Sequence, residues 1–428
     1  MAENHGQRPR SQQMGLPHLE ALPLFSRIDI HEREAVLKAL GKPLSGYLGG
    51  VHLGGYWVER LQEDAKALFK VKHAIACNSA TSGLLAACMA IGIKPGDIVW
   101  TSAYTMSATA ACAKVLGAGI ACIDIEPTRF SIDMNLLTGT MPKCIIVTNL
   151  FGHPAYISSM RSWCESNKVW MIEDNAQSPL AKERDLYAGT VGHIGVFSFN
   201  VHKHIQCGEG GLCVTNDSEI HNYLCDAINH GELAGSHRGL NLRMTEPIAA
   251  IAAVQLSRAK EIIQNRVELA QELSDMFAGI PWLRPPIEDT GCRHVYYCWA
   301  ALVADNKRNA LIRKLGAMGL PMKAGYSTPI HEIFNCPIMH TGLRPWVRRL
   351  EDNEIMTFEV CRYEPNWRQR RTMREIASRA VGEVEDEYRR SPNQSEGTTV
   401  SDSRDKRESL RFSAQRHSID KSSQAGGG

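Results

Sequence analysis

Residues 195–215 read GVFSFNVHKHIQCGEGGLCVT and form the most informative segment of the chain. The apolar runs 195–199 and 211–215 are short and continuous, which is typical of strands that are buried on both faces of a sheet. Lys203 lies in the loop between them, flanked by His202 and His204 and followed by a Gly-rich turn. Because α/β proteins bind ligands outside the carboxyl ends of their strands, this loop is a candidate site.

Comparable apolar runs alternate with helical patterns from about His73 to Thr215, which predicts a parallel sheet covered by helices. After Met244 the pattern changes to a helix over 246–274, with Arg258 on its polar face, then a strand over 295–303 and a helix over 307–318. The predicted fold class is α/β, with a mostly parallel seven-stranded sheet in a large domain and a smaller α+β C-terminal domain. The seven expected strands are 74–77, 98–100, 120–124, 144–148, 169–173, 195–199 and 211–215.

The predicted organisation has four parts. They are an N-terminal segment (1–43), the large α/β domain (44–245), the long helix with the small domain (246–387) and a tail (388–428). From about Tyr388 the composition shifts to Ser, Arg, Asp, Gln and Gly, with almost no apolar residues. Such a segment cannot offset the entropy cost of folding, so we expect the tail to be disordered.

Composition excludes several classes of protein. A chain of 428 residues with 43% hydrophobic side chains is expected to be globular with a large core. Lys plus Arg is 48 and Asp plus Glu is 46, so the net charge is only +2. The chain therefore lacks the strong positive charge that is typical of proteins that bind nucleic acid. The sequence contains neither a secretory signal nor a membrane-length apolar stretch, which indicates a cytoplasmic protein that does not bind membranes. Its 13 cysteines are scattered without C-x-x-C pairs, which favours buried thiols over disulfides or a metal site.

Three features of the sequence are candidates for catalysis or ligand binding: Lys203, Asp174 and the segment 78–84. Desolvation and neighbouring cations would lower the pKa of Lys203, and a neutral amine is what Schiff-base chemistry requires, although a solvated loop lysine stays open. Asp174 follows the strand 169–173, where a carboxylate is either a structural cap or the group that keeps the pyridine nitrogen of pyridoxal phosphate protonated. The two residues are 29 positions apart, so both can face one cleft. The string NSATSGL at 78–84 opens a helix whose N–H groups could approach a phosphate, or it is an ordinary N-cap.

These elements, in this order, resemble the fold-type-I, pyridoxal-phosphate-dependent nucleotide-sugar aminotransferases of the DegT/DnrJ/StrS family. The resemblance extends from about residue 44 to about residue 385. Besides the segments around Asp174 and Lys203, it includes KPGD at 94–97, LFGHP at 150–154, GEGG at 208–211, NHGE at 229–232 and GLNLRM at 239–244.

The resemblance implies a role for each matching residue, with pyridoxal 5'-phosphate as cofactor. Lys203 would form the internal aldimine and move the proton between substrate and cofactor. Asp174 would pair with the pyridine nitrogen, and Gln177 would contact the ring hydroxyl. His331 matches a family histidine near the substrate. Met106 stands where the family usually has an aromatic ring on the cofactor.

The phosphate site and the assembly also follow from the resemblance. It implies that Ala80, Thr81 and Ser198 hold the phosphate. Asn241 matches an asparagine that reaches the phosphate of the neighbouring subunit. A homodimer with shared active sites is therefore expected.

The implied reaction is amino transfer from an amino acid, glutamate by family resemblance, to a keto group of a nucleotide-linked deoxysugar for polysaccharide biosynthesis. One alternative is amination of a free cyclic ketone such as a keto-inositol. Another is a deoxysugar dehydratase of the same fold, in which histidine replaces the lysine, and Lys203 argues against it. A catalytically inert regulatory relative is the third, opposed by Lys203 and Asp174 but left open by Met106 and the tail.

Overall fold

The computed structural model describes residues 17–25, 28–44, 54–232, 239–326, 328–339 and 345–390. The chain divides into two compact units, 1–381 and 382–428. Residues 382–390 of the second unit continue helix α12 (Trp367–Arg390), and the rest of the predicted tail, 391–428, lies outside the described residues. The predicted domain boundary at residue 245 stays a prediction.

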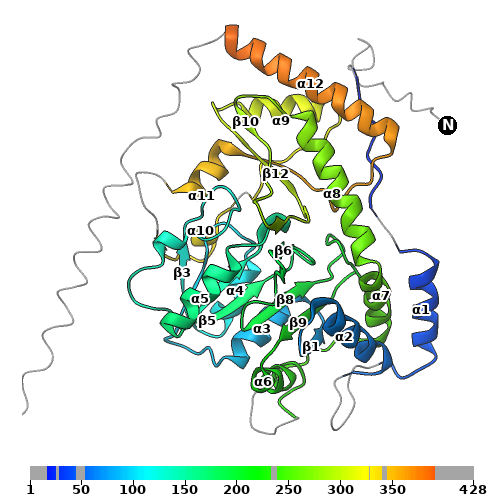
Figure 1. Cartoon of the computed structure of the whole chain (residues 1–428), viewed down its shortest axis with the longest axis vertical. Coiled ribbons are helices and arrows are strands. Elements are labelled where there is room, and N and C mark those ends of the chain that lie inside the picture. Colours follow the sequence, from blue (N-terminus) through cyan, green and yellow to red (C-terminus); the bar gives the residue numbers. More distant parts are fainter. Residues whose placement is uncertain are drawn as a thin grey trace, which may run out of the picture. The chain divides into compact units, whose positions relative to one another are not determined.

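The largest sheet of the first unit has eight strands within the described residues (Figure 1). Strand β9 is antiparallel to both its neighbours, and the other neighbouring strands pair in parallel. The seven predicted strands are confirmed with ends shifted by at most two residues, and a two-residue strand joins them at the edge. In spatial order the strands are β1 (His73–Cys77), β9 (Gly211–Thr215), β8 (Ile194–Ser198), β5 (Trp170–Asp174), β4 (Cys144–Thr148), β2 (Ile98–Ser102), β3 (Gly119–Ile123) and β13 (Ile338–Met339).

Helices cover this sheet (Figure 1). Every residue of β4, β8 and β9 is buried, as their continuous apolar sequences predict. Helices α3 (Ala80–Ala90), α4 (Ala108–Val115) and α6 (Ser218–Ile228) pack together, while α2 (Tyr56–Phe69) contacts β1 and α5 (Ile157–Asn167) contacts β5. The sequence of α3 is rich in Ala, and its one glycine, Gly83, faces Val196 of β8 and Cys213 of β9, so the helix lies close to the strands and its first turn reaches the cavity at their ends.

The later part of this unit contains a second sheet, formed by β10 (Leu283–Arg284), β12 (Trp299–Val303) and β14 (Ile355–Phe358), with α9 (Arg308–Ala317) against β14. The strand predicted to begin at Val295 begins at Trp299. The preceding backbone turns because Tyr296 has φ 51°, in the left-handed region. Strands β6 (Lys182–Glu183), β7 (Leu186–Tyr187) and β11 (Cys292–Arg293) form a third, small sheet, and the short helices include α10 (Ile330–Ile333) and α11 (Trp346–Arg349).

The single helix predicted over 246–274 is wrong, because the structure has two helices, α7 (Glu246–Ser257) and α8 (Ala259–Met276). The Ser257 hydroxyl donates to the Val254 carbonyl (2.7 Å), which competes with the helical hydrogen bonds at this point. Arg258 lies at the joint instead of on a solvent face, and it donates to Asp29 (2.7 Å) just before α1 (Ile30–Leu40). Both α1 and α2 pack on α7.

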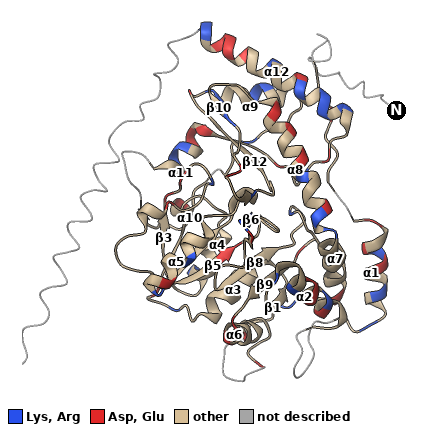
Figure 2. Ribbon diagram, viewed as in Figure 1, with Lys and Arg blue, Asp and Glu red and all other residues tan. Residues whose placement is uncertain are grey.

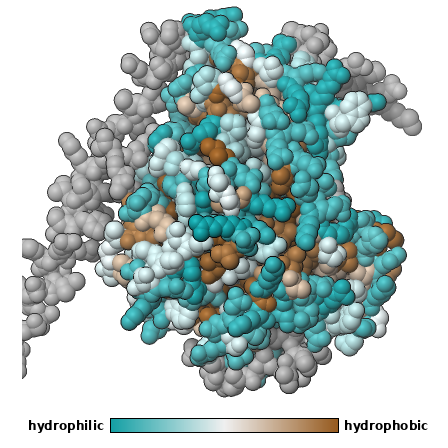
Figure 3. Space-filling model, viewed as in Figure 1, coloured by the Kyte–Doolittle hydropathy of each residue, from teal (hydrophilic) through white to brown (hydrophobic). Residues whose placement is uncertain are grey.

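The surface carries mixed charge, in agreement with the composition. Acidic and basic side chains alternate along α1 and α8 (Figure 2). The face in Figure 3 is mostly teal and white, with brown apolar residues in small groups. No helix among the described residues is long and apolar enough to cross a membrane. The cysteines are unpaired and buried, except Cys292 and Cys336, which are partly exposed.

Candidate active site

A cavity of about 370 Å³ lies at the carboxyl ends of β4, β5 and β8. This volume falls within the range of small-molecule sites. The cavity also receives residues from the first turn of α3 and from the loop after β2. Seven of the predicted site residues line it together: Ala80, Thr81, Met106, Asp174, Gln177, Ser198 and Lys203.

One end of the cavity is the N-terminus of α3. The Ser79 hydroxyl caps this helix by accepting the N–H of Ser82 (3.1 Å). The N–H groups of Ala80 and Thr81 belong to the first turn, where a helix offers donors without intrahelical partners. Strand β9 passes so close that a Cβ on Gly211 would lie 2.6 Å from the nitrogen of Ala80. This end therefore has the geometry of an anion site.

The adjacent carboxylates of β5 have separate roles. Glu173 points into the protein and accepts the N–H groups of Gly189, Val191 and Gly192 at 2.6–2.8 Å, so it is a structural cap. Asp174 lines the cavity, is 5% exposed, and accepts from the Thr109 hydroxyl at 2.7 Å. Burial raises the pKa of Asp174, while the hydrogen bond from Thr109 and the charge of Lys203 oppose that rise.

Lys203 also lies inside the cavity and is 8% exposed. Burial lowers the pKa of its amine, and nearby Asp174 opposes this shift. The expectation that neighbouring cations contribute is wrong. His202 is exposed, and His204 is a buried side chain that donates from Nε2 to the Val295 carbonyl (2.8 Å). Burial lowers the pKa of His204 to about 3, so this ring is neutral at physiological pH.

Gln177 is fixed by two hydrogen bonds. Its Oε1 accepts the N–H of Phe151 (2.9 Å), and its Nε2 donates to the hydroxyl of Tyr326 (2.8 Å). An amide nitrogen has two protons, so one N–H of Gln177 remains for a ligand. The N–H of Tyr326 in turn donates to the hydroxyl of Tyr104 (3.1 Å), which ties the segment before α10 to this wall of the cavity.

Comparison with known families agrees with this geometry. A sequence model of the DegT/DnrJ/EryC1/StrS aminotransferase family matches residues 47–335. The chain belongs to this family. Its aminotransferases depend on pyridoxal phosphate, and the resemblance predicted from the motifs is confirmed.

Individual relatives are distant but cover most of the chain. GDP-perosamine synthase of Caulobacter vibrioides is 28% identical over 71% of this chain and 84% of its own length. The dTDP-3-amino-3,4,6-trideoxy-alpha-D-glucose transaminase of Streptomyces venezuelae is 25% identical over 75% of this chain and 84% of its own length. The E. coli GDP-4-keto-6-deoxy-D-mannose-3-dehydratase, solved with hydrated pyridoxal phosphate, superposes with a TM-score of 0.73 at 21% identity. That superposition covers 84% of this chain and 100% of the dehydratase chain, and it supports the fold-type-I class.

Three predicted residues lie at or beyond the edge of the cavity. Met106, which the resemblance places at the family's aromatic position, lines the cavity but is 50% exposed. Within the described residues, Asn241 and His331 are not part of the lining. The residue after Asn241 accepts the N–H of Asn78 (2.8 Å), so this segment borders the turn that begins α3. The residue before His331 donates to the Ala103 carbonyl (3.3 Å), so α10 begins beside the loop that carries Met106.

Several residues at the site are not among the predicted ones, including Thr105, Thr148 and Tyr297 in the lining and Thr109 behind Asp174. The sequence could have indicated the threonines, because Thr148 is a polar residue at the end of the buried strand β4 and Thr105 and Thr109 stand four positions apart near Met106. No sequence pattern indicates Tyr297, because its ring meets the Lys203 amine (4.4 Å to the ring centroid) from a segment 94 residues later in the chain.

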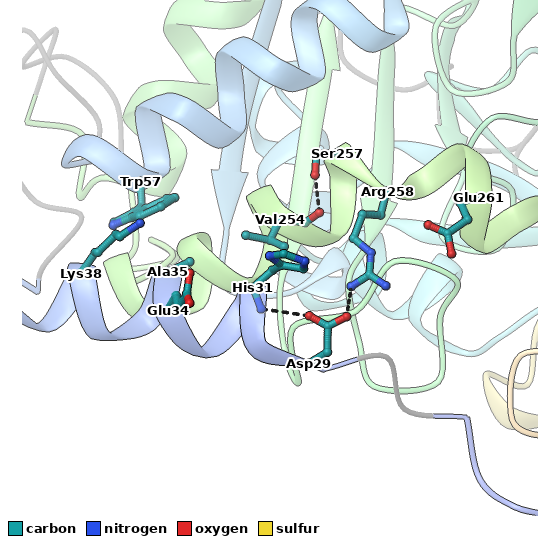
Figure 4. Close-up of a pocket in the computed structure, with 10 residues that line it drawn as sticks. All are labelled: Asp29, His31, Glu34, Ala35, Lys38, Trp57, Val254, Ser257, Arg258 and Glu261. Carbon is teal, nitrogen blue, oxygen red and sulfur yellow. Dashed lines mark hydrogen bonds and ion pairs between the residues drawn. The ribbon is translucent and has the colours of Figure 1, made fainter.

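A larger hollow of about 600 Å³ lies beside α1, α7 and the start of α8 (Figure 4). Two of its charged side chains pair with each other, since Asp29 accepts from Arg258 (2.7 Å) as well as from the backbone N–H of His31 (2.9 Å). None of the predicted site residues lines it. The smaller cavity is therefore the candidate active site.

Proposed function

We propose that the protein is a pyridoxal-phosphate-dependent aminotransferase that moves an amino group from an amino acid, glutamate as first candidate, to a keto group of a nucleotide-linked deoxysugar. It acts in the cytoplasm as a homodimer. The observation that carries the proposal is the burial of an amine, Lys203, and a carboxylate, Asp174, in one cavity whose end is the N-terminus of α3. An amine, a carboxylate and an anion site are the three groups that this cofactor requires.

The residues fit pyridoxal phosphate at each of its functional groups. The first N–H groups of α3, with the hydroxyls of Thr81 and Ser198, suit the phosphate. Asp174 suits the pyridine nitrogen, and the remaining N–H of Gln177 suits the ring hydroxyl. Lys203 holds the cofactor through Nζ. When bound, the cofactor supplies an electron sink that stabilises a carbanion next to the transferred nitrogen.

The chain's own groups then have defined tasks. Burial favours the neutral amine of Lys203, which can act as a nucleophile and later as the base that carries a proton at Nζ. Asp174 holds a proton on the ring nitrogen. Asn241 completes the phosphate site of the partner subunit, and His331 contacts the substrate from α10.

Two observations favour a nucleotide-linked sugar and amino transfer. The relatives quoted above are named for GDP- and dTDP-linked sugars, which favours a nucleotide-linked substrate. Because these two nucleotides differ, experiment must identify the nucleotide. The family resemblance puts Lys203 where the dehydratases have a histidine, and this favours amino transfer.

The test is a panel assay. Protein loaded with pyridoxal phosphate is incubated with nucleotide-linked keto-sugars, a free keto-inositol and several amino donors, and products are read by mass spectrometry. Borohydride treatment should fix the cofactor on Lys203 in a peptide map. Lys203→Ala should lose this attachment and turnover, whereas Asp174→Asn should keep the attachment and lose mainly turnover. Amino transfer by Lys203→Ala, or attachment to another lysine, would refute the assignment.

A further inference from the structure

Three threonine hydroxyls form a line that ends on Asp174. The Thr109 hydroxyl, in the first turn of α4, is 2.7 Å from Oδ2 of Asp174. Thr105, in the loop after β2, is 3.2 Å from Thr109 and 3.0 Å from Thr148 at the end of β4. All four side chains are buried, and that of Thr109 is 0% exposed. The line therefore joins three elements to one carboxylate, and the hydroxyl that contacts this carboxylate is shielded from water.

Counting protons gives the line a direction. An ionised carboxylate only accepts, so the Thr109 hydroxyl must donate to Asp174. Its single proton is then used, and Thr109 must accept from Thr105. By the same count Thr105 accepts from Thr148. All three O–H dipoles point toward the carboxylate, and hydrogen bonds aligned in this way strengthen one another.

The other groups around Asp174 provide little alternative support. Lys203 contributes its charge, but burial lowers the pKa of that amine, so the support is lost when the amine becomes neutral. The thiol of Cys112 and the hydroxyl of Tyr326 also lie near Asp174. The hydrogen bond with Cys88 and burial raise the pKa of Cys112, and burial raises the pKa of Tyr326, so neither group is charged near neutral pH. The backbone N–H of Ala176 donates at 3.2 Å.

We propose that Thr109, backed by Thr105 and Thr148, is a positioning residue that keeps Asp174 ionised and aimed into the cavity after Lys203 has lost its charge. The inference rests on the proposed function for its catalytic meaning, because an ionised Asp174 is what holds a proton on the ring nitrogen of pyridoxal phosphate. The effect on the carboxyl group itself exists without the cofactor.

The first experiment uses the apoprotein. The chain is labelled with ¹³C at the aspartate carboxyl carbons, the Asp174 signal is assigned with Asp174→Asn, and the signal is titrated with pH. Thr109→Val keeps the shape and removes the hydroxyl, so the pKa of Asp174 should rise by about one unit or more. Thr109→Ser keeps the hydroxyl and should titrate like the unmodified chain. An unchanged pKa in folded Thr109→Val would overturn the proposal.

The second experiment uses pyridoxal phosphate labelled with ¹⁵N. The ¹⁵N shift should show a protonated ring nitrogen in the unmodified chain and in Thr109→Ser, and a neutral one over part of the pH range in Thr109→Val. The Kd for the cofactor should rise roughly 10- to 100-fold in Thr109→Val. If the unmodified chain binds no cofactor, the proposed function fails. The apoprotein titration still tests whether the Thr109 hydroxyl lowers the pKa of Asp174.

Thr105→Val provides a second variant in case Thr109→Val does not fold. It leaves the hydrogen bond to Asp174 in place and removes the donor behind it, so the same shifts are expected at smaller size. Thermal unfolding of each apoprotein checks the fold. Shifts equal for Thr109→Val and Thr109→Ser would indicate a packing effect and would overturn the role of the hydroxyl.

Discussion

Replacement of Gly211 by alanine should damage the anion site and the fold together. Gly211 is the first residue of β9, paired with Ser198 of β8 on one side and Cys77 of β1 on the other. Its new Cβ would lie 2.5 Å from the carbonyl carbon of Ser79 and 2.6 Å from the nitrogen of Ala80. These distances are about 1 Å shorter than an ordinary contact.

The size of the effect follows from what would have to move. The atoms that the new Cβ would meet belong to the backbone at the start of α3, and β9 is paired with a strand on each side. The clash therefore cannot be relieved by rotation of a side chain. Overpacking of this kind costs about 1–3 kcal/mol, and we expect about 2 kcal/mol for Gly211→Ala. A displaced helix N-terminus also misplaces the phosphate donors, so the Kd for pyridoxal phosphate should rise roughly tenfold, which is about 1.4 kcal/mol.

Urea unfolding of the apoprotein, followed by circular dichroism, measures the first effect, and cofactor titration measures the second. Gly316→Ala in α9 is the matched control. A Cβ there meets nothing within 4 Å, so this variant should be unchanged or up to about 1 kcal/mol more stable. An unchanged unfolding midpoint and an unchanged Kd in Gly211→Ala would contradict the predicted clash between the alanine Cβ and the start of α3.

Three further substitutions test other contacts. Burial lowers the pKa of His204 to about 3, so between about pH 3 and pH 6.5 this ring is protonated mainly in the unfolded chain, and stability falls as the pH drops through this range. In His204→Gln the loss of unfolding free energy between pH 6.5 and pH 5.5, measured in urea, should be smaller by about 1 kcal/mol, and an equal loss would contradict this. Glu246→Gln should lower the free energy of unfolding by about 2 kcal/mol, because the carboxylate accepts three backbone N–H groups at the start of α2 (2.8–3.1 Å). A urea midpoint equal to that of the unmodified chain would argue against this cap. Tyr326→Phe removes the acceptor of Gln177 and should raise the cofactor Kd roughly fivefold in an absorbance titration, with unfolding unchanged. An unaltered Kd would mean that Gln177 is oriented without it.

The sheet could be predicted because its strands are continuous apolar runs that require burial on both faces. The same regularity brings Asp174 and Ser198 together, since they end the adjacent parallel strands β5 and β8, and Lys203 follows five positions after Ser198. Their meeting in one cavity depends on topology alone. A sequence pattern that indicates parallel strands therefore also predicts which strand ends share a site.

The contacts that could not be predicted depend on local backbone conformation. Tyr297 meets Lys203 because Tyr296 adopts φ 51° and the N–H of Cys298 donates to the Phe151 carbonyl (3.2 Å). The break at Arg258 depends on a side chain bonding within its own helix and on acidic partners more than 220 residues earlier. No periodicity in the chain encodes a single positive φ or a partner so distant in sequence.

The pair Glu173 and Asp174 shows why residue type alone did not settle the role of a carboxylate. A strand alternates its side chains between its two faces, so two acids in succession cannot enter the same environment. One meets the backbone N–H groups of the loop at 189–192, and the other meets a threonine hydroxyl and an amine. Glu173 is therefore a structural cap, whereas the role of Asp174 at the pyridine nitrogen stays a proposal. Which acid faces the cavity was set by the last position of β5, and the register with Thr148 of β4 places Asp174 beside the hydroxyl line that supports its charge.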